Sequence, residues 1–482
     1  MMKWICAAAL VLSCVFITAA SVPAGATPVY TDEPPSYEML LVSGSGVAVE
    51  ESNLTFDFSE DTSGDAIPGA TVTAEYRVAN QQDADKSLLL ALPVVTDLIS
   101  LTKNEPTLTV DGFAAAHALL LGSAAEWAVG GGQDGGTSQL EALKQAYQEA
   151  ANLSYSAQDN AFYQSARLYA LTAPAQADSY ELVVTMNIDL QKSQLIYYGF
   201  RSYQYDGIRT VRLSATVQKG SDVNLGFAVW DNGADVSVPV ISYYADTNQA
   251  NPLPDQGAFF TEQPAVMREL IGGALMRYVY TLGPEDILPP GFAKSQQLYD
   301  LAMREVDQAF SRGHSVNLDA CITACFTLER FAFYCYRVAF PANAVQDLVV
   351  QYTAEGSMDR RSTQNPVYSY QYLTGAVKSW PIFGNWNATV IPPGQAPYVV
   401  RSAPELTAQD DSSYRASLLE PPSESLSFSL YADQTVVVSA PKKGTILSGV
   451  SLYQLALGLL FLLVAFSLVL ILVLMVRNHK RS

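Results

Sequence analysis

The sequence has few of the residues that catalytic and metal sites most often use, and it has little positive charge. It contains three His and five Cys among 482 residues, so imidazole-based catalysis and zinc ligation have few candidates. Charged residues make up only 16% of the chain, and 28 Lys and Arg stand against 47 Asp and Glu, which gives a net charge of −19. A protein that binds nucleic acid normally presents a basic face, so this balance argues against that class.

The motifs of nucleotide-binding proteins and zinc proteases are also absent. The chain has no phosphate-binding P-loop, no HExxH helix and no dinucleotide-binding fingerprint, in which a glycine-rich turn directly follows a strand and opens a helix. Hydrophobic residues, in contrast, reach 49% and aromatic residues 11%, which excludes a disordered chain and allows large cores. At roughly 100 to 200 residues per domain, we expect one to three folded units.

The N-terminus has the pattern of a secretory signal peptide. Lys3 supplies a positive charge, residues 5–20 are apolar or small, and residues 24–26 (Ala-Gly-Ala) provide the small side chains of a cleavage site. We therefore predict a signal peptide over residues 1–26, with an uncleaved N-terminal anchor as the alternative. Residues 27–39 are rich in proline and acidic residues, and they predict a flexible leader.

The C-terminus predicts a single transmembrane helix over residues 451–476. Its part from 455 to 476 contains no charged residue, and at 1.5 Å per residue it is about 33 Å long, against about 30 Å for the hydrocarbon core of a bilayer. The tail 477–482 is basic, and such tails stay in the cytoplasm by the positive-inside rule. We therefore expect a single-pass protein of the cell membrane with its N-terminus outside the cell and a linker over residues 441–450.

Alternating polar and apolar residues predict strands over most of the region 40–261. Residues 71–78 (TVTAEYRV) alternate, and a polar turn separates them from a second apolar run at 87–92, which predicts an antiparallel hairpin. Further strand patterns follow one another at roughly ten-residue spacing between 180 and 244. Such regular spacing is typical of a β-sandwich or an open barrel.

Helical patterns interrupt the strands twice. Residues 113–170 predict a helical insertion, because 113–129 is rich in Ala and Leu and 138–152 places apolar residues at helical spacing. Residues 262–312 predict a second helical section, and strand patterns return over 313–440. The sequence thus predicts a mainly β fold with helical insertions, of the α+β class: an antiparallel β-sandwich ectodomain with two β units, followed by the transmembrane helix.

Three cysteines, Cys321, Cys325 and Cys335, follow the predicted signal peptide. An odd number excludes a complete disulfide framework. Cys321 and Cys325 are four residues apart, so on a helix they share one face and their spacing permits a bridge. The surrounding residues are Ala, Ile, Phe and Tyr, which favours buried free thiols instead. A metal site here would need a fourth ligand, and His314 is the nearest histidine, so we predict no metal site.

Few side chains qualify as catalytic groups. His117 lies in the run FAAAHALLL and His314 follows a predicted helix end, so we interpret both as structural residues, with His117 packed on a helix. Carboxylate pairs serve glycosidases, but 47 acidic residues offer too many candidates for the pattern to select any; these include Asp231, Asp235, Glu285, Asp286, Asp410 and Asp411. Aromatic residues cluster at 197–205, 242–244 and 368–372. Stacked tyrosines on the face of a sheet can bind sugar rings or a partner. Tyr and Phe are also common in ordinary strands, and this is the interpretation that we favour. We predict no catalytic, cofactor-binding or metal-binding residue.

Three segments resemble uncharacterised cell-surface proteins of low-GC Gram-positive bacteria. They are AEYRVANQQDADKSLLLALP at 74–93, YQYLTGAVKSWPIFGNWNATVIPP at 370–393 and SLSFSL at 425–430. The resemblance implies a signal peptide, a β-rich ectodomain and one C-terminal span, and it implies no particular activity. The C-terminus also resembles a sortase-sorted tail, but residues 440–444 (APKKG) depart from the LPxTG motif at its Leu and Thr positions. The membrane span is therefore the expected anchor.

Together these features predict a non-enzymatic, membrane-anchored extracellular protein that serves adhesion, sensing or envelope scaffolding. The absence of nucleophile and metal motifs favours this class over an enzyme. The alternative is a carboxylate-dependent envelope hydrolase or a carbohydrate-binding protein. The expected partners are the membrane and either another envelope protein or a glycan, with no nucleic acid and no cofactor. Two carboxyl groups about 5 to 10 Å apart in an aromatic-lined cleft would favour the hydrolase.

Overall fold

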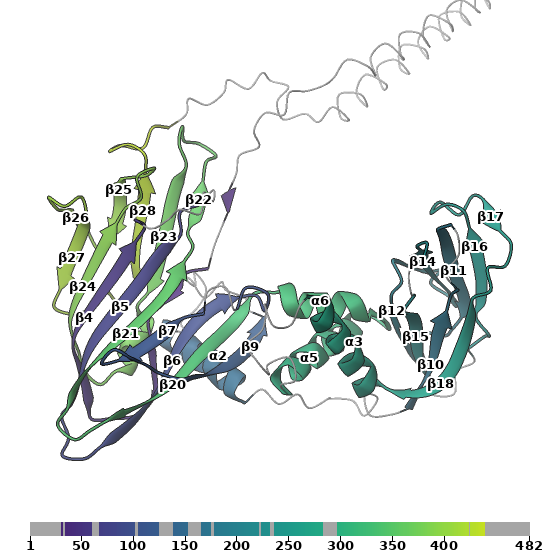
Figure 1. Ribbon diagram of the computed structural model, residues 1–482, viewed down its shortest axis with the longest axis horizontal. Coiled ribbons are helices and arrows are strands. Elements are labelled where there is room, and N and C mark those ends of the chain that lie inside the picture. Colours follow the sequence, from purple (N-terminus) through teal and green to yellow (C-terminus); the bar gives the residue numbers. More distant parts are fainter. Residues whose placement is uncertain are drawn as a thin grey trace, which may run out of the picture.

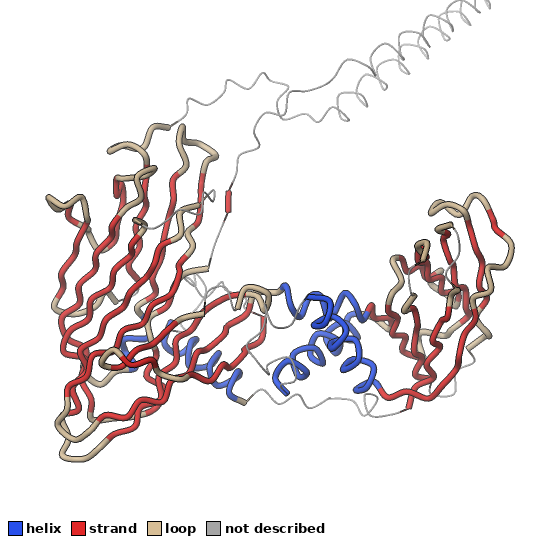
Figure 2. The backbone as a smooth tube through the Cα atoms, viewed as in Figure 1, coloured by secondary structure: helices blue, strands red, loops and turns tan. Residues whose placement is uncertain are grey.

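The computed structural model describes residues 30–31, 34–59, 67–101, 105–124, 138–152, 165–174, 178–220, 223–231, 236–282, 296–423 and 425–438. Its strands form five sheets, and the described part also contains four α-helices (Figure 1, Figure 2). The prediction of a mainly β fold with helices is therefore confirmed.

The predicted ends of the chain lie outside these residues: the signal peptide 1–26, the linker 441–450, the transmembrane helix 451–476 and the tail 477–482. Among the helices that the structure describes, none combines the length and the apolar character that crossing a membrane requires. The topology therefore stays a prediction.

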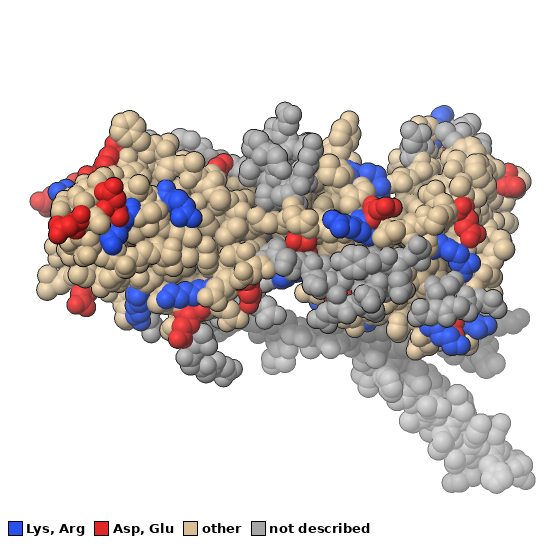
Figure 3. Space-filling view, turned by 90° about the horizontal axis from the view of Figure 1, so that it is seen from below, with Lys and Arg blue, Asp and Glu red and all other residues tan. Residues whose placement is uncertain are grey.

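The molecule has a larger and a smaller β lobe with helices between them (Figure 1). The larger lobe consists of the described residues up to 152 and from 330 onward, and the smaller lobe consists mainly of the described residues between 165 and 266. We refer to residues 165–266 as the inserted unit, because they interrupt the chain of the larger lobe. On the face shown in Figure 3, charged side chains are scattered among uncharged ones over both lobes.

The larger lobe contains an eight-stranded and a six-stranded sheet. The eight-stranded sheet has the order β26 (Thr407–Ala408), β27 (Tyr414–Leu418), β24 (Phe383–Ile391), β4 (Val47–Asp57), β5 (Ala70–Asn80), β21 (Val345–Ala354), β7 (Thr107–Val110) and β8 (Phe113–Ala114). The six-stranded sheet has the order β1 (Tyr30–Thr31), β22 (Ser357–Asp359), β23 (Val367–Leu373), β28 (Ser425–Tyr431) and β25 (Tyr398–Ala403), and β2 (Ser36–Tyr37) also pairs with β23. Neighbouring strands are antiparallel except in the pairs β4–β24 and β2–β23.

Aromatic side chains fill the space between these two sheets. The rings of Phe58 and Tyr370 lie 4.8 Å apart, and those of Phe56 and Phe428 lie 5.1 Å apart, both edge to face. Strand β23 alternates, so that every second residue from Tyr368 onward is buried in this core. The aromatic run 368–372 is therefore an ordinary core strand.

The chain crosses between sheets where a hairpin was predicted. β5 ends at Asn80, and the next strand, β6 (Lys86–Thr96), lies in a four-stranded sheet with β3 (Leu40–Ser43), β20 (Arg330–Phe340) and β9 (His117–Ala124). β6 pairs with β20 along its whole length, and β5 pairs with β21. The hairpin prediction is wrong, because β5 lies between β4 and β21 and β6 lies between β3 and β20, so that one partner of each strand comes from the C-terminal part of the chain. For the same reason, the predicted β units 40–261 and 313–440 share sheets instead of folding apart.

Two further predictions are corrected in this lobe. Residues 113–124 form the strands β8 and β9 rather than a helix, because β9 pairs with β20 and this distant pairing overrides the local preference of Ala and Leu. The leader 27–39 is not flexible throughout, since β2 pairs with β23 and Tyr37, Glu38 and Met39 are buried. The predicted helix at 138–152 is confirmed as α2 (Gln139–Ala151), which Ser138 caps through the backbone N–H of Glu141.

The inserted unit contributes nine of the ten strands of two five-stranded sheets around a core of its own, and the tenth strand, β19, lies after it in the chain. The first sheet has the order β18 (Phe259–Val266), β10 (Ser165–Thr172), β15 (Leu225–Asp231), β12 (Ser193–Tyr198) and β19 (Ser315–Asn317); the second has the order β13 (Ser202–Tyr205), β14 (Thr210–Val217), β11 (Tyr180–Asn187), β16 (Val240–Tyr244) and β17 (Pro252–Leu253). The rings of Tyr197 and Tyr203, one from each sheet, stack 5.4 Å apart. The predicted insertion 113–170 thus ends in β10, which is a strand.

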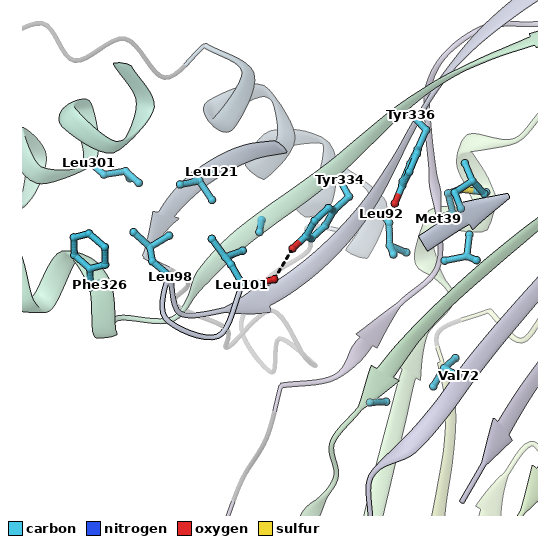
Figure 4. Packing of buried hydrophobic residues seen from close by; sticks show 14 of the residues in the cluster. Met39, Val72, Leu92, Leu98, Leu101, Leu121, Leu301, Phe326, Tyr334 and Tyr336 are labelled. Carbon is cyan, nitrogen blue, oxygen red and sulfur yellow. Dashed lines mark hydrogen bonds between the residues drawn. The ribbon is translucent and has the colours of Figure 1, made fainter. Parts of the chain in front are cut away.

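Three helices connect the lobes: α3 (Met267–Leu282), α5 (Gln296–Arg312) and α6 (Leu318–Thr327). Figure 4 shows Leu98 and Leu121 of the larger lobe directed toward Leu301 of α5 and Phe326 of α6. The backbone N–H of Leu98 also donates to the carbonyl of Phe326 at 3.1 Å. The same buried cluster reaches Ala228 on the outer face of the first sheet of the inserted unit, so this sheet is covered on both faces.

Candidate binding cleft

A cleft of about 860 Å³ opens at one margin of the inserted unit. Strands β10 and β18 of one sheet and strands β16 and β17 of the other contribute its lining. The volume is within the range of about 300 to 1,000 Å³ that is typical of small-ligand sites. The cleft therefore lies where the two sheets end beside each other.

Two aromatic residues of the lining, Tyr169 and Phe260, form a packed floor on the buried ring of Phe227. The ring of Tyr169 stacks on Phe227 at 4.8 Å, and Phe260 meets Phe227 edge to face at 5.6 Å. Tyr169 and Phe227 are directly paired on neighbouring strands, and Phe260 lies on β18, which pairs with the other side of β10. Direct cross-strand pairing brings side chains on one face within contact distance, so this floor exists before any ligand binds.

A second tyrosine fixes the far wall. The hydroxyl of Tyr243 on β16 donates to the carbonyl of Ala258 at 3.4 Å and accepts the backbone N–H of Ala258 at 3.1 Å. Burial raises the pKa of Tyr243 to about 12, so the hydroxyl keeps its proton at physiological pH. The Asp255 carboxylate accepts the backbone N–H of Gly257 at 2.8 Å, in a turn where Gly257 has φ +78°. The chain between β17 and β18 is thereby held against β16.

The rim combines exposed apolar side chains with charges. Val238 is 85% exposed and Phe259 is 54% exposed, although both are large and apolar. Arg167, Asp255 and Glu262 supply the charged part of the lining. Exposed apolar groups beside a few polar ones are typical of a surface that binds a partner or ligand.

The two histidines that the sequence singles out lie away from this cleft. His117 lies on strand β9, not on a helix, and its Nε2 is 3.2 Å from Oε1 of Glu105. Its ring also packs edge to face on Tyr334 at 5.2 Å. His314 lies between α5 and β19, and its carbonyl accepts the backbone N–H of Leu195 at 2.9 Å. Neither imidazole is paired with a nucleophile in the described part of the chain.

The carboxylate candidates do not come together either. Asp411 accepts the backbone N–H and the hydroxyl of Ser413 and pairs with Arg415 at 2.7 Å, and the bond from Ser413 lowers the pKa of Asp411. This arrangement stabilises an exposed turn beside Asp410. Asp231 is the last residue of β15. Three of the candidates lie outside the described residues: Asp235, Glu285 and Asp286.

The three described cysteines are free thiols. Cys321 and Cys325 lie on one face of α6, and Cys335 lies on β20. Burial raises the pKa of Cys321 to about 11, of Cys325 to about 12 and of Cys335 to about 11, so the thiols stay protonated. Within the described ranges, no three His, Cys, Asp or Glu side chains gather as a metal ion would require.

A buried carboxyl group in the larger lobe was missed, because it lies in the segment that was predicted to be flexible. Glu38 is 2% exposed, and its Oε1 accepts the hydroxyl of Tyr76 and the backbone N–H of Met39. Burial raises the pKa of Glu38 to about 7, while hydrogen bonds from Tyr76, Met39 and Tyr372 act in the opposite direction. Because the group is enclosed, it cannot reach a ligand, and we interpret it as part of the core.

Sequence reasoning found only part of the cleft. The run 242–244 contributes Tyr243 and Tyr244 to the lining, whereas Tyr169, Phe259 and Phe260 belong to no segment that the pattern selected. The sequence signal that points to this part of the cleft is the dipeptide Phe259–Phe260, which follows a turn at Gly257. Its position at a sheet margin depends on pairing with β10, which the local sequence does not reveal.

Comparisons with known proteins give little further information. No protein-family model and no curated protein matches the chain. One solved structure with some similarity is that of a protein from Legionella pneumophila subsp. pneumophila str. Philadelphia 1, described provisionally as a nutrient binding protein. The match has a TM-score of 0.33 and 8% sequence identity, and it covers 84% of this chain and 73% of the other. A similarity of this size supports no argument about fold or function.

Proposed function

We propose that the chain is a membrane-anchored extracellular protein that binds a ligand in the cleft of the inserted unit and serves adhesion, sensing or envelope scaffolding without catalysis. The observation that carries the proposal is the aromatic-floored cleft with Val238 and Phe259 exposed on its rim. The proposed anchor is the apolar segment 451–476, and the proposed ectodomain consists of two β-sandwich units. The resemblance to low-GC Gram-positive surface proteins supports the same location.

Recovery of envelope material by the full chain tests the binding function. The variant Phe259→Asp places a charge on the apolar rim and should abolish recovery of a protein or glycan from solubilised membranes. Phe113→Asp is a matched control, because Phe113 is 80% exposed and lies on β8 of the larger lobe. Equal recovery by both variants and the unchanged chain would refute a role for the cleft.

The proposed topology has a separate test. Protease added to intact cells without their wall should digest the ectodomain and leave a small membrane-bound fragment around residues 451–476. Complete protection of the ectodomain would contradict an extracellular location.

A second candidate function is a carboxylate-dependent hydrolase, which Asp255 and Glu262 favour because both line the same aromatic cleft. Release of reducing sugar from envelope glycan distinguishes it from binding. Under the binding proposal, the full chain releases none. Sugar release that disappears in both Asp255→Asn and Glu262→Gln would replace the binding proposal with the hydrolase.

A further inference from the structure

The hydrogen-bonding direction of β18 can be derived from one bond at the other end of its sheet. The backbone N–H of Leu195 on β12 donates to the carbonyl of His314, so the polar backbone groups of Leu195 point away from β15. In an antiparallel ladder, directly opposed residues alternate between hydrogen-bonded and non-bonded pairs. Leu195 and Val229 are therefore a non-bonded pair, and Val229 must bond to Arg167 on β10. Arg167 and Pro264 are then non-bonded.

The proline on β18 agrees with this derivation. Pro264 has no N–H, so it fits a position that makes no bond to β10. Along a strand, the N–H and C=O groups of every second residue point to the same side. The backbone groups of Phe260 and Glu262 must therefore point away from β10 as those of Pro264 do, toward the open margin. β18 is the last strand of its sheet in the described part of the chain, as Figure 1 also shows.

Further evidence comes from Ala258, which precedes β18 in the same alternation. Its N–H and carbonyl both bond to the hydroxyl of Tyr243 across the cleft. The next two outward positions, Phe260 and Glu262, have no comparable partner among the described residues. The two positions are about 7 Å apart, the length of two residues in a strand, and both residues line the cleft.

We infer that the cleft binds an extended polypeptide segment, which adds to the open margin of β18 as a further strand and bonds to the main chain of Phe260 and Glu262. The inference rests on the proposed binding function of the cleft. An added strand repeats its donors and acceptors at the same spacing of about 7 Å and sends alternate side chains to one face. Those side chains would meet the aromatic floor.

Charge and length restrict the segment further. Asp255 and Glu262 stand against one Arg167 in the lining, so a segment with basic side chains is favoured. Pro264 interrupts the outward N–H groups after Glu262, so the added strand is short. Short, interrupted edges are also how proteins avoid unspecific pairing between sheets. A glycan could stack on the aromatic floor, but it has no backbone with donors and acceptors at the spacing of the main-chain groups of Phe260 and Glu262.

The substitution Glu262→Pro tests the ladder. It removes an N–H that points outward and leaves the bonds between β18 and β10 in place, as Pro264 already does two residues later. Glu262→Gln is the matched control, because it removes the same charge but keeps the N–H. Gln263→Pro tests the other side of the strand, because the N–H of Gln263 points toward β10. This variant should therefore lower the thermal midpoint, whereas Glu262→Pro should not.

The probe is a displayed library of random heptapeptides, selected on the full chain in detergent, with chitohexaose as the glycan probe. We expect selected peptides to bind about fivefold more weakly to Glu262→Pro than to Glu262→Gln, the effect of losing one hydrogen bond. No enriched peptide, or equal binding to both variants, overturns the peptide inference. Chitohexaose binding that Phe259→Asp abolishes and Glu262→Pro leaves unchanged also overturns it but retains the cleft as a binding site. If neither probe binds and recovery of envelope material does not depend on Phe259, the proposed function fails as well.

Discussion

Replacing Glu38 by glutamine would measure what it costs the protein to enclose a carboxyl group between the two sheets of its larger lobe. Glutamine has nearly the same shape and carries no charge at any pH. The groups around Glu38 are the tyrosines Tyr76, Tyr352 and Tyr372, whose own pKa values are raised by burial. These phenols stay neutral below pH 9, so a change between pH 5 and pH 8 in this part of the core comes from Glu38.

The direction and size of the effect follow from its pKa. The pKa of Glu38 is raised from 4.5 to about 7, so the folded protein holds a proton that the unfolded chain releases. The contribution of this proton to stability is complete below pH 4.5 and is lost as the pH rises through 7. At about 1.4 kcal/mol for each tenfold change, the loss between pH 5 and pH 8 is on the order of 2 to 3 kcal/mol. The Glu38→Gln variant should not lose it.

Hydrogen exchange in residues 36–43 is a suitable assay, because the separate cores make unfolding of the whole chain unsuitable for a two-state treatment. The backbone N–H of Met39 donates to Glu38, and that of Leu41 donates to Oγ of Ser379. After correction for intrinsic rates, protection of this segment in the variant relative to the unchanged chain should rise by about 2 to 3 kcal/mol from pH 5 to pH 8. Glu75→Gln, an exposed neighbour of Tyr76, is the control. Parallel pH profiles for the chain and Glu38→Gln would refute the reasoning.

Three other predictions concern packing and thiols. Phe227→Ala should cost the inserted unit about 3 to 5 kcal/mol and make it sensitive to protease while the larger lobe stays resistant, since its core is separate; equal sensitivity of both lobes would contradict this. Asn80→Ala should destabilise the larger lobe by about 2 to 4 kcal/mol, because the Asn80 amide donates to the carbonyls of Ala84, Phe340 and Pro341, and an unchanged urea midpoint would argue against this role. All three thiols should react slowly with a disulfide reagent at pH 8 until denaturant is added, because burial raises their pKa values; fast labelling of all three in the native chain would show that they are exposed.

Local patterns correctly predicted elements whose secondary structure can be read from the spacing of neighbouring residues alone. The alternation at 71–78 lies within β5, and the helical spacing at 138–152, with Ser138 as the cap, gives α2. Both patterns arise from neighbouring residues, because side-chain direction repeats every 2 residues in a strand and every 3.6 in a helix. The two apolar ends of the chain likewise predict a topology from composition alone.

The tertiary structure decided which strands pair, and through that it decided the cleft. Pairing with β20 makes 117–124 a strand, and pairing with β21 separates β5 from β6. The cleft requires Tyr169, Tyr243 and Phe260 on three strands of two sheets. Strand formation is governed by neighbours across the sheet more than by intrinsic preference, and those neighbours are distant in the chain. The local pattern therefore predicts which side chains of a strand are buried. Which strand pairs with each edge, and which edge stays open as at β18, is decided only when the sheets assemble.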